Sequence, residues 1–372
     1  MEVSKAKTTS FEPVKKTRIL SWLPNRETLP GIGICIAVAA LAYITNAFFY
    51  KQVSPLMYAF LYAIILANVI KLPKSFGAGI LWSSSSWLRF SMALMGLTIS
   101  ALSWLQLGIV GVIQVIIVIA FALFLGIWLG RKMGLSPELS ILMGAGCSIC
   151  GATAIAATGP VLKAKDEELG VAVASVTIFG LFAMILYPFL FQSTALGDFL
   201  HKSQVAYGMW AGTGIHETAQ VIPAGTQVGE EAGAMAMVAK SVRIFSIGPV
   251  VLICAYIFNR LKGSDTVGAS NMRLGIPTFA IFFVLFTLLN SLLLYLPSTK
   301  TAWKAFYNTI QYGEVIKVFL AVAFAGVGFK VHYSSIQKLG VKSFLVGMIV
   351  SVAVGILALL LVKFIYMPYS GI

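Results

Sequence analysis

The fold is decided by two polar, glycine-rich stretches, GAGCSICGAT at residues 144–153 and WAGTGIHETAQ at residues 210–220. Each interrupts a run of apolar residues. Backbone that leaves a helix at membrane depth must line a cavity or be buried in protein, because hydrocarbon cannot satisfy its free N–H and C=O groups. Paired breaks of this kind in two related halves of a chain indicate the substrate site of a transporter.

The two halves of the chain also match each other. The glycine-rich stretches align at an offset of 66 residues, and the Glu-Glu-x-Gly sequence at 167–170 recurs 63 residues later at 230–233. A second match relates the Gly-x6-Ser-x3-Leu-Gly pattern at 96–108 to the same pattern at 328–340. Because each pair is expected to face opposite sides of the membrane, the matches predict an inverted repeat.

The composition excludes an ordinary soluble domain. Mean hydropathy is +0.91 and hydrophobic residues make up 59% of the 372 residues. Charged residues make up only 11%, against about 25% in soluble domains. The net charge of +14 would suggest nucleic acid in a soluble chain, but here the basic residues sit mostly in short loops between apolar runs. Such charge sets topology and attracts anionic lipid headgroups, so we expect the lipid bilayer as a partner and no nucleic acid.

A membrane-spanning helix needs roughly 20 apolar residues. The sequence predicts an all-α membrane protein with about nine such helices plus the two broken segments. The nine candidate spans are residues 31–50, 55–72, 79–102, 105–130, 168–194, 231–258, 274–296, 313–330 and 342–366. We expect residues 1–29 to form a basic cytoplasmic N-terminal extension and residues 30–372 a polytopic transporter domain. Within that domain, residues 138–258 hold the core elements and the remaining helices form a scaffold.

The path of the broken segments is open between two alternatives. If residues 138–165 cross the membrane fully, Lys163 and Lys165 lie outside, whereas a re-entrant hairpin keeps them inside with Arg131 and Lys132. The positive-inside rule favours the hairpin. The second broken segment then enters from the opposite face.

Few ionisable side chains fall within the predicted membrane segments. Each costs about 2.5 to 3.5 kcal/mol on insertion scales, so those present are candidates for function. Lys240 and Arg243 follow Glu231 by about 13 and 18 Å of helix, near the middle of a roughly 30 Å core. With Glu217 they leave one excess positive charge, which favours an anionic substrate. Alternatively, Glu217 forms a structural ion pair with Lys240 or Arg243, and His216 beside it is a candidate for proton coupling.

Neutral side chains in the breaks complete the predicted substrate site. Ser148, Thr153, Thr213 and Gln220 can provide ligands to an anion or to a sodium ion, or they can make ordinary hydrogen bonds between helices. The Cys-x-x-Cys pair at 147–150 has no second pair of cysteines or histidines, so we expect no metal site. We expect no cofactor, with H+ or Na+ as the coupling ion.

The stretches CSICGATAIAA at residues 147–157 and GIHETAQV at residues 214–221 resemble the two signature stretches of the YeiH-type bacterial membrane proteins. The resemblance extends from about residue 31 to the C-terminus, and the name of that family refers to sulfate export. It implies a multi-pass protein of the bacterial inner membrane. The wider group, with cation/proton antiporters and bile-acid-type symporters, implies a scaffold and a moving core that contains two broken elements.

The function expected from sequence is secondary active transport of a small anion, sulfate or sulfonate-like, by alternating access. Two other classes stay open. A channel is one, although no selectivity filter is recognisable. An intramembrane enzyme that uses His216 and Glu217 is the other, but no zinc-protease or serine-hydrolase motif is present and we expect no enzyme. The chain has no Gly-x4-Gly-Lys-Ser/Thr motif, so an ion gradient or a partner must supply the energy. The oligomeric state is also open, with a homodimer as one possibility.

Overall fold

The computed structural model describes the chain at residues 24–48, 54–99, 101–262, 278–309, 312–331 and 340–371. Every regular element in these ranges is a helix, which confirms the all-α prediction. Most of the expected N-terminal extension lies outside the described residues, as does part of the second sequence match, at 332–339.

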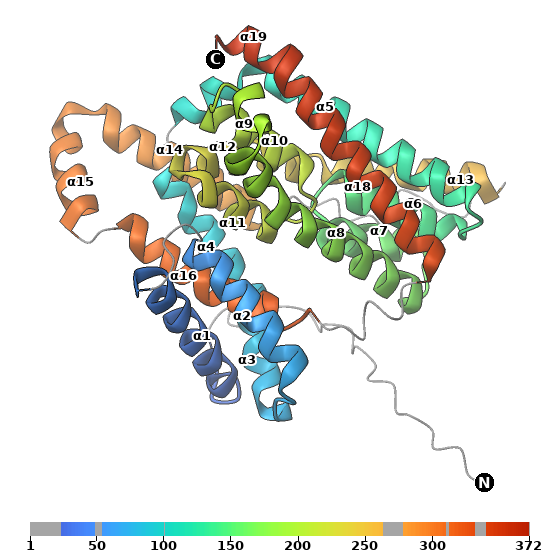
Figure 1. The fold of residues 1–372 in the computed structure, drawn as a ribbon, viewed down its shortest axis with the longest axis horizontal. Coiled ribbons are helices and arrows are strands. Elements are labelled where there is room, and N and C mark those ends of the chain that lie inside the picture. Colours follow the sequence, from blue (N-terminus) through green and yellow to red (C-terminus); the bar gives the residue numbers. More distant parts are fainter. Residues whose placement is uncertain are drawn as a thin grey trace.

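One group of helices occupies the lower left of Figure 1. It consists of α1 (Leu29–Phe48), α2 (Pro55–Val69), α3 (Gly77–Trp82), α4 (Leu88–Met95) and α16 (Tyr312–Gly328). A Cβ built on Gly31 would lie 2.7 Å from the Cα of Gly79, so the backbones of α1 and α3 touch. Close approach at small residues is typical of helix packing in membranes. We call this group the scaffold.

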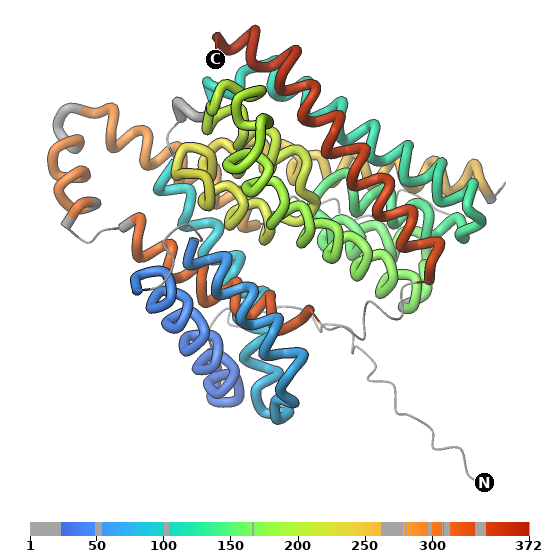
Figure 2. The backbone as a smooth tube through the Cα atoms, viewed as in Figure 1, coloured from blue at the N-terminus to red at the C-terminus, as the bar shows by residue number. Residues whose placement is uncertain are grey.

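The second group holds both glycine-rich stretches, and we call it the core. Its helices are α5 (Ala101–Lys132), α6 (Pro137–Ser148), α7 (Ala152–Leu162), α8 (Asp166–Ser193), α9 (Ala195–Phe199), α10 (Gln204–Gly214), α11 (Thr218–Val228), α12 (Glu230–Phe245), α13 (Ile247–Lys262), α18 (Val341–Leu361) and α19 (Met367–Ser370). The last helices, drawn in red, run beside α5 in Figures 1 and 2. Helix α14 (Thr278–Tyr295) packs on α4 and is followed by α15 (Pro297–Thr309).

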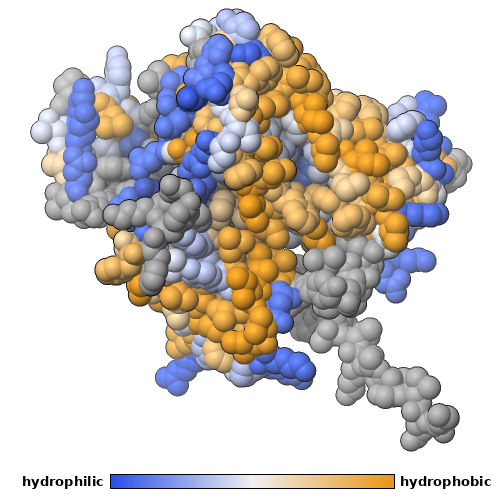
Figure 3. Space-filling view, in the orientation of Figure 1, coloured by the Kyte–Doolittle hydropathy of each residue, from blue (hydrophilic) through white to orange (hydrophobic). Residues whose placement is uncertain are grey.

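Fewer described helices qualify as membrane spans than the nine expected. Four are long and apolar enough, α1 and the helices at 104–132, 167–193 and 341–370, and the bent pair α12 and α13, at 44°, would make a fifth. The others are shorter or divided: a π-helical turn, Ser83–Trp87, interrupts the span expected at 79–102, and α2 has 15 residues. The expected count of about nine is therefore not confirmed. Figure 3 shows apolar residues over most of the visible face and hydrophilic residues near its margins.

The first glycine-rich stretch forms a helical hairpin. Ser136 caps α6 by accepting a hydrogen bond from the backbone N–H of Leu139 (3.1 Å). The chain leaves the helix after Ser148 and turns at Gly151, whose φ of +68° favours glycine. A Cβ built on Gly146 would lie 2.8 Å from the side chain of Ile155, so α7 folds back onto α6.

The second stretch forms another hairpin, against α12. A Cβ built on Gly208 would lie 2.5 Å from the carbonyl of Ala232, and one built on Gly225 would lie 2.8 Å from Gly233. Near the open end of the hairpin, the Tyr207 hydroxyl donates to the carbonyl of Ala224 (3.0 Å). Helix α10 therefore runs parallel to α12 while α11 returns antiparallel to it.

Helix α8 joins the two hairpins. At its start, Glu168 accepts a hydrogen bond from Ser136 (2.5 Å) at the open end of the first hairpin. At its other end, Gln192 donates to the carbonyl of Gln227 (3.1 Å) at the open end of the second. Since α8 has 28 residues, about 40 Å of helix, the hairpins approach from opposite ends and their tips meet near its middle.

Candidate functional site

Arg243 of α12 holds the tips of both hairpins. Its side chain is fully buried. Towards the first hairpin, Nη2 donates to the carbonyl of Cys147 (2.6 Å) and Nε to that of Ser148 (2.9 Å). Towards the second, Nη1 donates to the carbonyls of Thr213 (2.5 Å) and Ile215 (3.3 Å). One guanidinium therefore bonds the C-terminal ends of α6 and α10 at once.

Lys240 lies one turn earlier on the same face of α12 and forms hydrogen bonds to the second tip only. Its ammonium donates to the carbonyl of Ile215 (2.8 Å) and also to that of His216. Like Arg243, Lys240 is fully buried. The last carbonyls of a helix have no partner within the helix and carry partial negative charge, which cations stabilise. Both cations thus satisfy backbone that an interrupted helix would leave unpaired.

Glu217 lies at the N-terminal ends of the returning helices. It is the residue before α11, and its Oε1 accepts a hydrogen bond from the hydroxyl of Thr177 in α8 (2.8 Å). A Cβ built on Gly151, the residue before α7, would lie 2.5 Å from Cγ of Glu217. A carboxylate is favourable at helix N-termini. Glu217 is thus hydrogen-bonded to Thr177, and the ion pairs among the described residues lie elsewhere.

The remaining polar groups tie the second tip to neighbouring helices. His216 is 1% exposed, and its Nε2 lies 2.6 Å from the hydroxyl of Ser351 in α18. Gln220 donates through Nε2 to the carbonyl of Thr177 (2.9 Å), while its Oε1 is buried with no hydrogen-bond partner among the described residues. Sequence reasoning missed Thr177 and Ser351 because single hydroxyls within apolar helices carry no signal of their own.

Ser148 and Thr213 bond within their own helices, and Thr153 differs from both in its exposure. Ser148 donates to the carbonyl of Ala145 (2.9 Å) and Thr213 to that of Met209 (2.7 Å). Thr153 is exposed on the first turn of α7, whereas Ser148 and Thr213 are fully buried. Among the eight residues predicted for the substrate site, Thr153 alone is exposed.

Polar contacts between the described residues join this core to the scaffold. Lys317 of α16 bonds Glu230 at the start of α12 (2.8 Å) and Glu314 in its own helix (2.8 Å). The backbone N–H of Ser54, before α2, donates to Oε1 of Gln227 (2.6 Å). Both contacts lie near the open end of the second hairpin, away from the buried tips.

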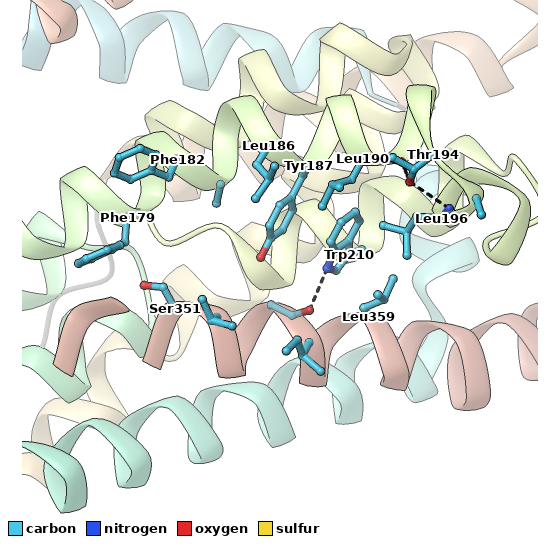
Figure 4. A pocket seen from close by; sticks show the side chains of 15 residues that line it. Phe179, Phe182, Leu186, Tyr187, Leu190, Thr194, Leu196, Trp210, Ser351 and Leu359 are labelled. Carbon is cyan, nitrogen blue, oxygen red and sulfur yellow. Dashed lines mark hydrogen bonds between the residues drawn. The ribbon is translucent and has the colours of Figure 1, made fainter. Parts of the chain in front are cut away.

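The two hairpin tips meet at Lys240 and Arg243, and we call this region the crossing. A cavity of about 490 Å³ lies beside it, between α8 and α18 (Figure 4). Its lining is mostly apolar. Ser351 lines its inner end and also contacts His216. Tyr187 and Trp210 stack with ring centroids 4.0 Å apart, and Trp210 donates to the carbonyl of Gly355 (2.9 Å).

The chain is similar to bacterial membrane proteins over most of its length. Residues 30–347 match the family model described as conserved hypothetical protein 698. The UPF0324 inner membrane protein YeiH of Salmonella typhimurium is 33% identical over 319 residues, 85% of this chain and 86% of the relative. The UPF0324 membrane protein PA5383 of Pseudomonas aeruginosa is 32% identical over 340 residues, 90% and 93% of the two chains. YeiH of Escherichia coli is 30% identical over 331 residues, 86% and 89%. The chain therefore belongs to the UPF0324 family of membrane proteins, which includes YeiH.

Proposed function

We propose that this protein is a secondary transporter of a small anion and that its core moves against its scaffold by alternating access. The observation that carries the proposal is the meeting of two hairpins, from opposite ends of α8, at fully buried charged residues. Broken helices that meet near the middle of the membrane provide free backbone groups for a substrate while protein covers the rest. The opposed hairpins also support the inverted repeat expected from the sequence.

The charge at the crossing favours an anion. Lys240, Arg243 and Glu217 sum to one positive charge in a region where an uncompensated charge is costly. The N-cap residues of α7 and α11 make no side-chain capping bond to their own helix. At α7, the Glu217 carboxylate accepts a hydrogen bond from the backbone N–H of Ala152. Such N–H groups and the positive end of the helix dipole bind anions. Sulfate or a sulfonate has the negative charge that this arrangement favours.

The position of the cations changes the expected mode of binding. The guanidinium of Arg243 makes four hydrogen bonds to carbonyls, so it does not present an open fork to a ligand. We propose that Arg243 and Lys240 act through their charge, while the first turn of α7 and the exposed Thr153 contact the anion directly. Glu217, beside that turn, repels the anion unless it carries a proton, which would couple proton and anion binding.

We further propose the bacterial inner membrane as the location, with the N-terminus in the cytoplasm. The names of the YeiH relatives support the location, and the basic loops support the orientation by the positive-inside rule. Repeated hairpins with shared charges suit alternating access better than a single catalytic site. For this reason we favour a carrier over an intramembrane enzyme or a channel.

The test is flux of labelled sulfate and of an alkyl sulfonate into proteoliposomes, with pH and sodium gradients imposed separately. We expect saturable uptake of at least one anion driven by one gradient. Thr153→Val should raise the KM for that anion, whereas Thr226→Val, a hydroxyl bonded within its own helix far from the tips, should not. Absence of gradient-driven flux of either anion, with protein shown to be folded, would refute the proposal.

A further inference from the structure

The cavity between α8 and α18 opens on the apolar outer face of the core. Its walls include Phe182, Leu186 and Leu190 of α8 and Val352, Ile356 and Leu359 of α18. Several of these side chains are exposed although they are apolar, for example Phe182 at 60% and Val352 at 57%. The volume of 490 Å³ lies within the range of about 300 to 1,000 Å³ that is common for small-molecule sites.

The cavity has the length of one lipid leaflet. Along α8 it extends from Phe179 to Leu190, about 17 Å of helix, and along α18 from Ser351 to Leu359, about 12 Å. Half of a roughly 30 Å hydrocarbon core is about 15 Å. Its inner end is at Ser351, level with the hairpin tips, and its outer end is at Thr194 and the short helix α9.

A cation lies just beyond the outer end. Leu359 and Leu196 line the outer end of the cavity. Lys363 follows Leu359 by four residues and Phe199 follows Leu196 by three, so each lies about one helical turn beyond the lining. The ammonium of Lys363 lies 2.9 Å from Nε2 of His201 and 5.0 Å from the centroid of the Phe199 ring.

Among the charged residues near the outer end, Lys363 is the cation that can pair with a ligand. Lys202 and Asp198 form an ion pair of their own at 3.1 Å. Lys363 takes part in none of the ion pairs found among the described residues. This apolar cavity, which we also call the groove, is as long as one lipid leaflet is thick and has a cation at its outer end. It therefore complements an amphiphile that has an anionic head.

We propose that the groove binds an anionic phospholipid, with an acyl chain between α8 and α18 and the phosphate at Lys363 and His201. This site goes beyond the proposed transport function and does not depend on which anion is carried. The end of the acyl chain would reach Ser351, which contacts His216 at the second tip. A lipid bound in the groove would therefore support α18, which contacts the second hairpin tip through Ser351.

The experiment is native mass spectrometry of the purified protein with added phosphatidylglycerol, compared with phosphatidylcholine. We expect tighter binding of phosphatidylglycerol to the wild type. Lys363→Gln should weaken that binding about five-fold, the effect of removing one Lys near a lipid headgroup. Ala183→Trp, which fills the cavity, should weaken the binding of both lipids.

Two matched variants serve as controls. Lys202→Gln removes a cation at the same end whose charge is already paired, and Ala120→Trp adds the same ring on an exposed face of α5. Both should bind lipid like the wild type, and size-exclusion profiles should show that all variants are folded. Equal lipid binding by wild type, Lys363→Gln and Ala183→Trp would overturn the proposal. It would also be overturned if glycerol phosphate without acyl chains bound as tightly, or if Ala183→Trp converted a dimer to a monomer without changing lipid retention.

Discussion

Replacing Arg243 with glutamine should loosen both hairpins at once. The guanidinium makes four hydrogen bonds to backbone carbonyls, and a glutamine amide has only two N–H donors. At least two of the four hydrogen bonds to buried carbonyls are then lost, although the Ile215 carbonyl keeps the Lys240 ammonium as a donor. Each loss costs about 0.6 kcal/mol by the average for membrane proteins and up to about 3 kcal/mol for a bond to a charged group. We expect a total of about 3 kcal/mol, or roughly 6 to 12 °C in melting temperature at about 2 to 4 °C per kcal/mol.

The assay is thermal unfolding in detergent, followed by loss of the monodisperse size-exclusion peak. Arg131→Gln is the matched control, because Arg131 is exposed and makes a single bond to the carbonyl of Leu135 (3.3 Å). Lys240→Gln should lie between the two, since Lys240 makes two carbonyl bonds. If Arg243→Gln melts within about 1 °C of the Arg131 control, these bonds do not hold the tips together and the reasoning fails.

Three further predictions concern topology, motion and coupling. Cysteines introduced at Lys165 and Glu230 should react with an impermeant reagent from opposite sides of the membrane, because the hairpins enter from opposite ends of α8; labelling of both from one side would exclude that arrangement. A disulfide between cysteines placed at Ser54 and Gln227 would tie the scaffold to the core, so it should stop flux, and reduction of the disulfide should restore flux. Undiminished flux in the oxidised protein would show that these regions do not separate. Glu217→Gln should remove the response of flux to a pH gradient while leaving anion binding intact or stronger, because the amide keeps an acceptor for Thr177 but exchanges no proton; a pH response equal to that of the wild type would rule out Glu217 as the proton carrier.

The sequence predicted the breaks well because several glycine and polar residues in succession weaken a helix that must otherwise cross an apolar layer without interruption. The prediction that Lys240 and Arg243 lie near the middle of the apolar layer used helix rise alone. Their partners did not, because a backbone carbonyl is present at every residue and leaves no mark in the sequence. The two expectations for these cations, an open anion site or an ion pair with Glu217, both considered side chains and ligands only.

The count of spanning helices was harder to predict, since hydropathy measures composition and not continuity. The run at 79–102 is apolar on average although it contains four serines at 83–86, and a π-helical turn at Ser83–Trp87 divides it at these serines. Helix α16 contains Glu314 and Lys317 within 17 residues. Thr177 and Ser351 were equally invisible, because each matters through a partner on a distant part of the chain.

The bonds of Arg243 have a consequence for how relatives of this chain can vary. The guanidinium contacts main-chain oxygens at Cys147, Ser148, Thr213 and Ile215, and every amino acid supplies such an oxygen. Substitutions that preserve the backbone path at these four positions should therefore be tolerated, whereas lysine at 243 offers a single nitrogen and cannot reach all four oxygens. We therefore expect the arginine to be nearly invariant among relatives, while the amino acids at the four positions that it contacts vary.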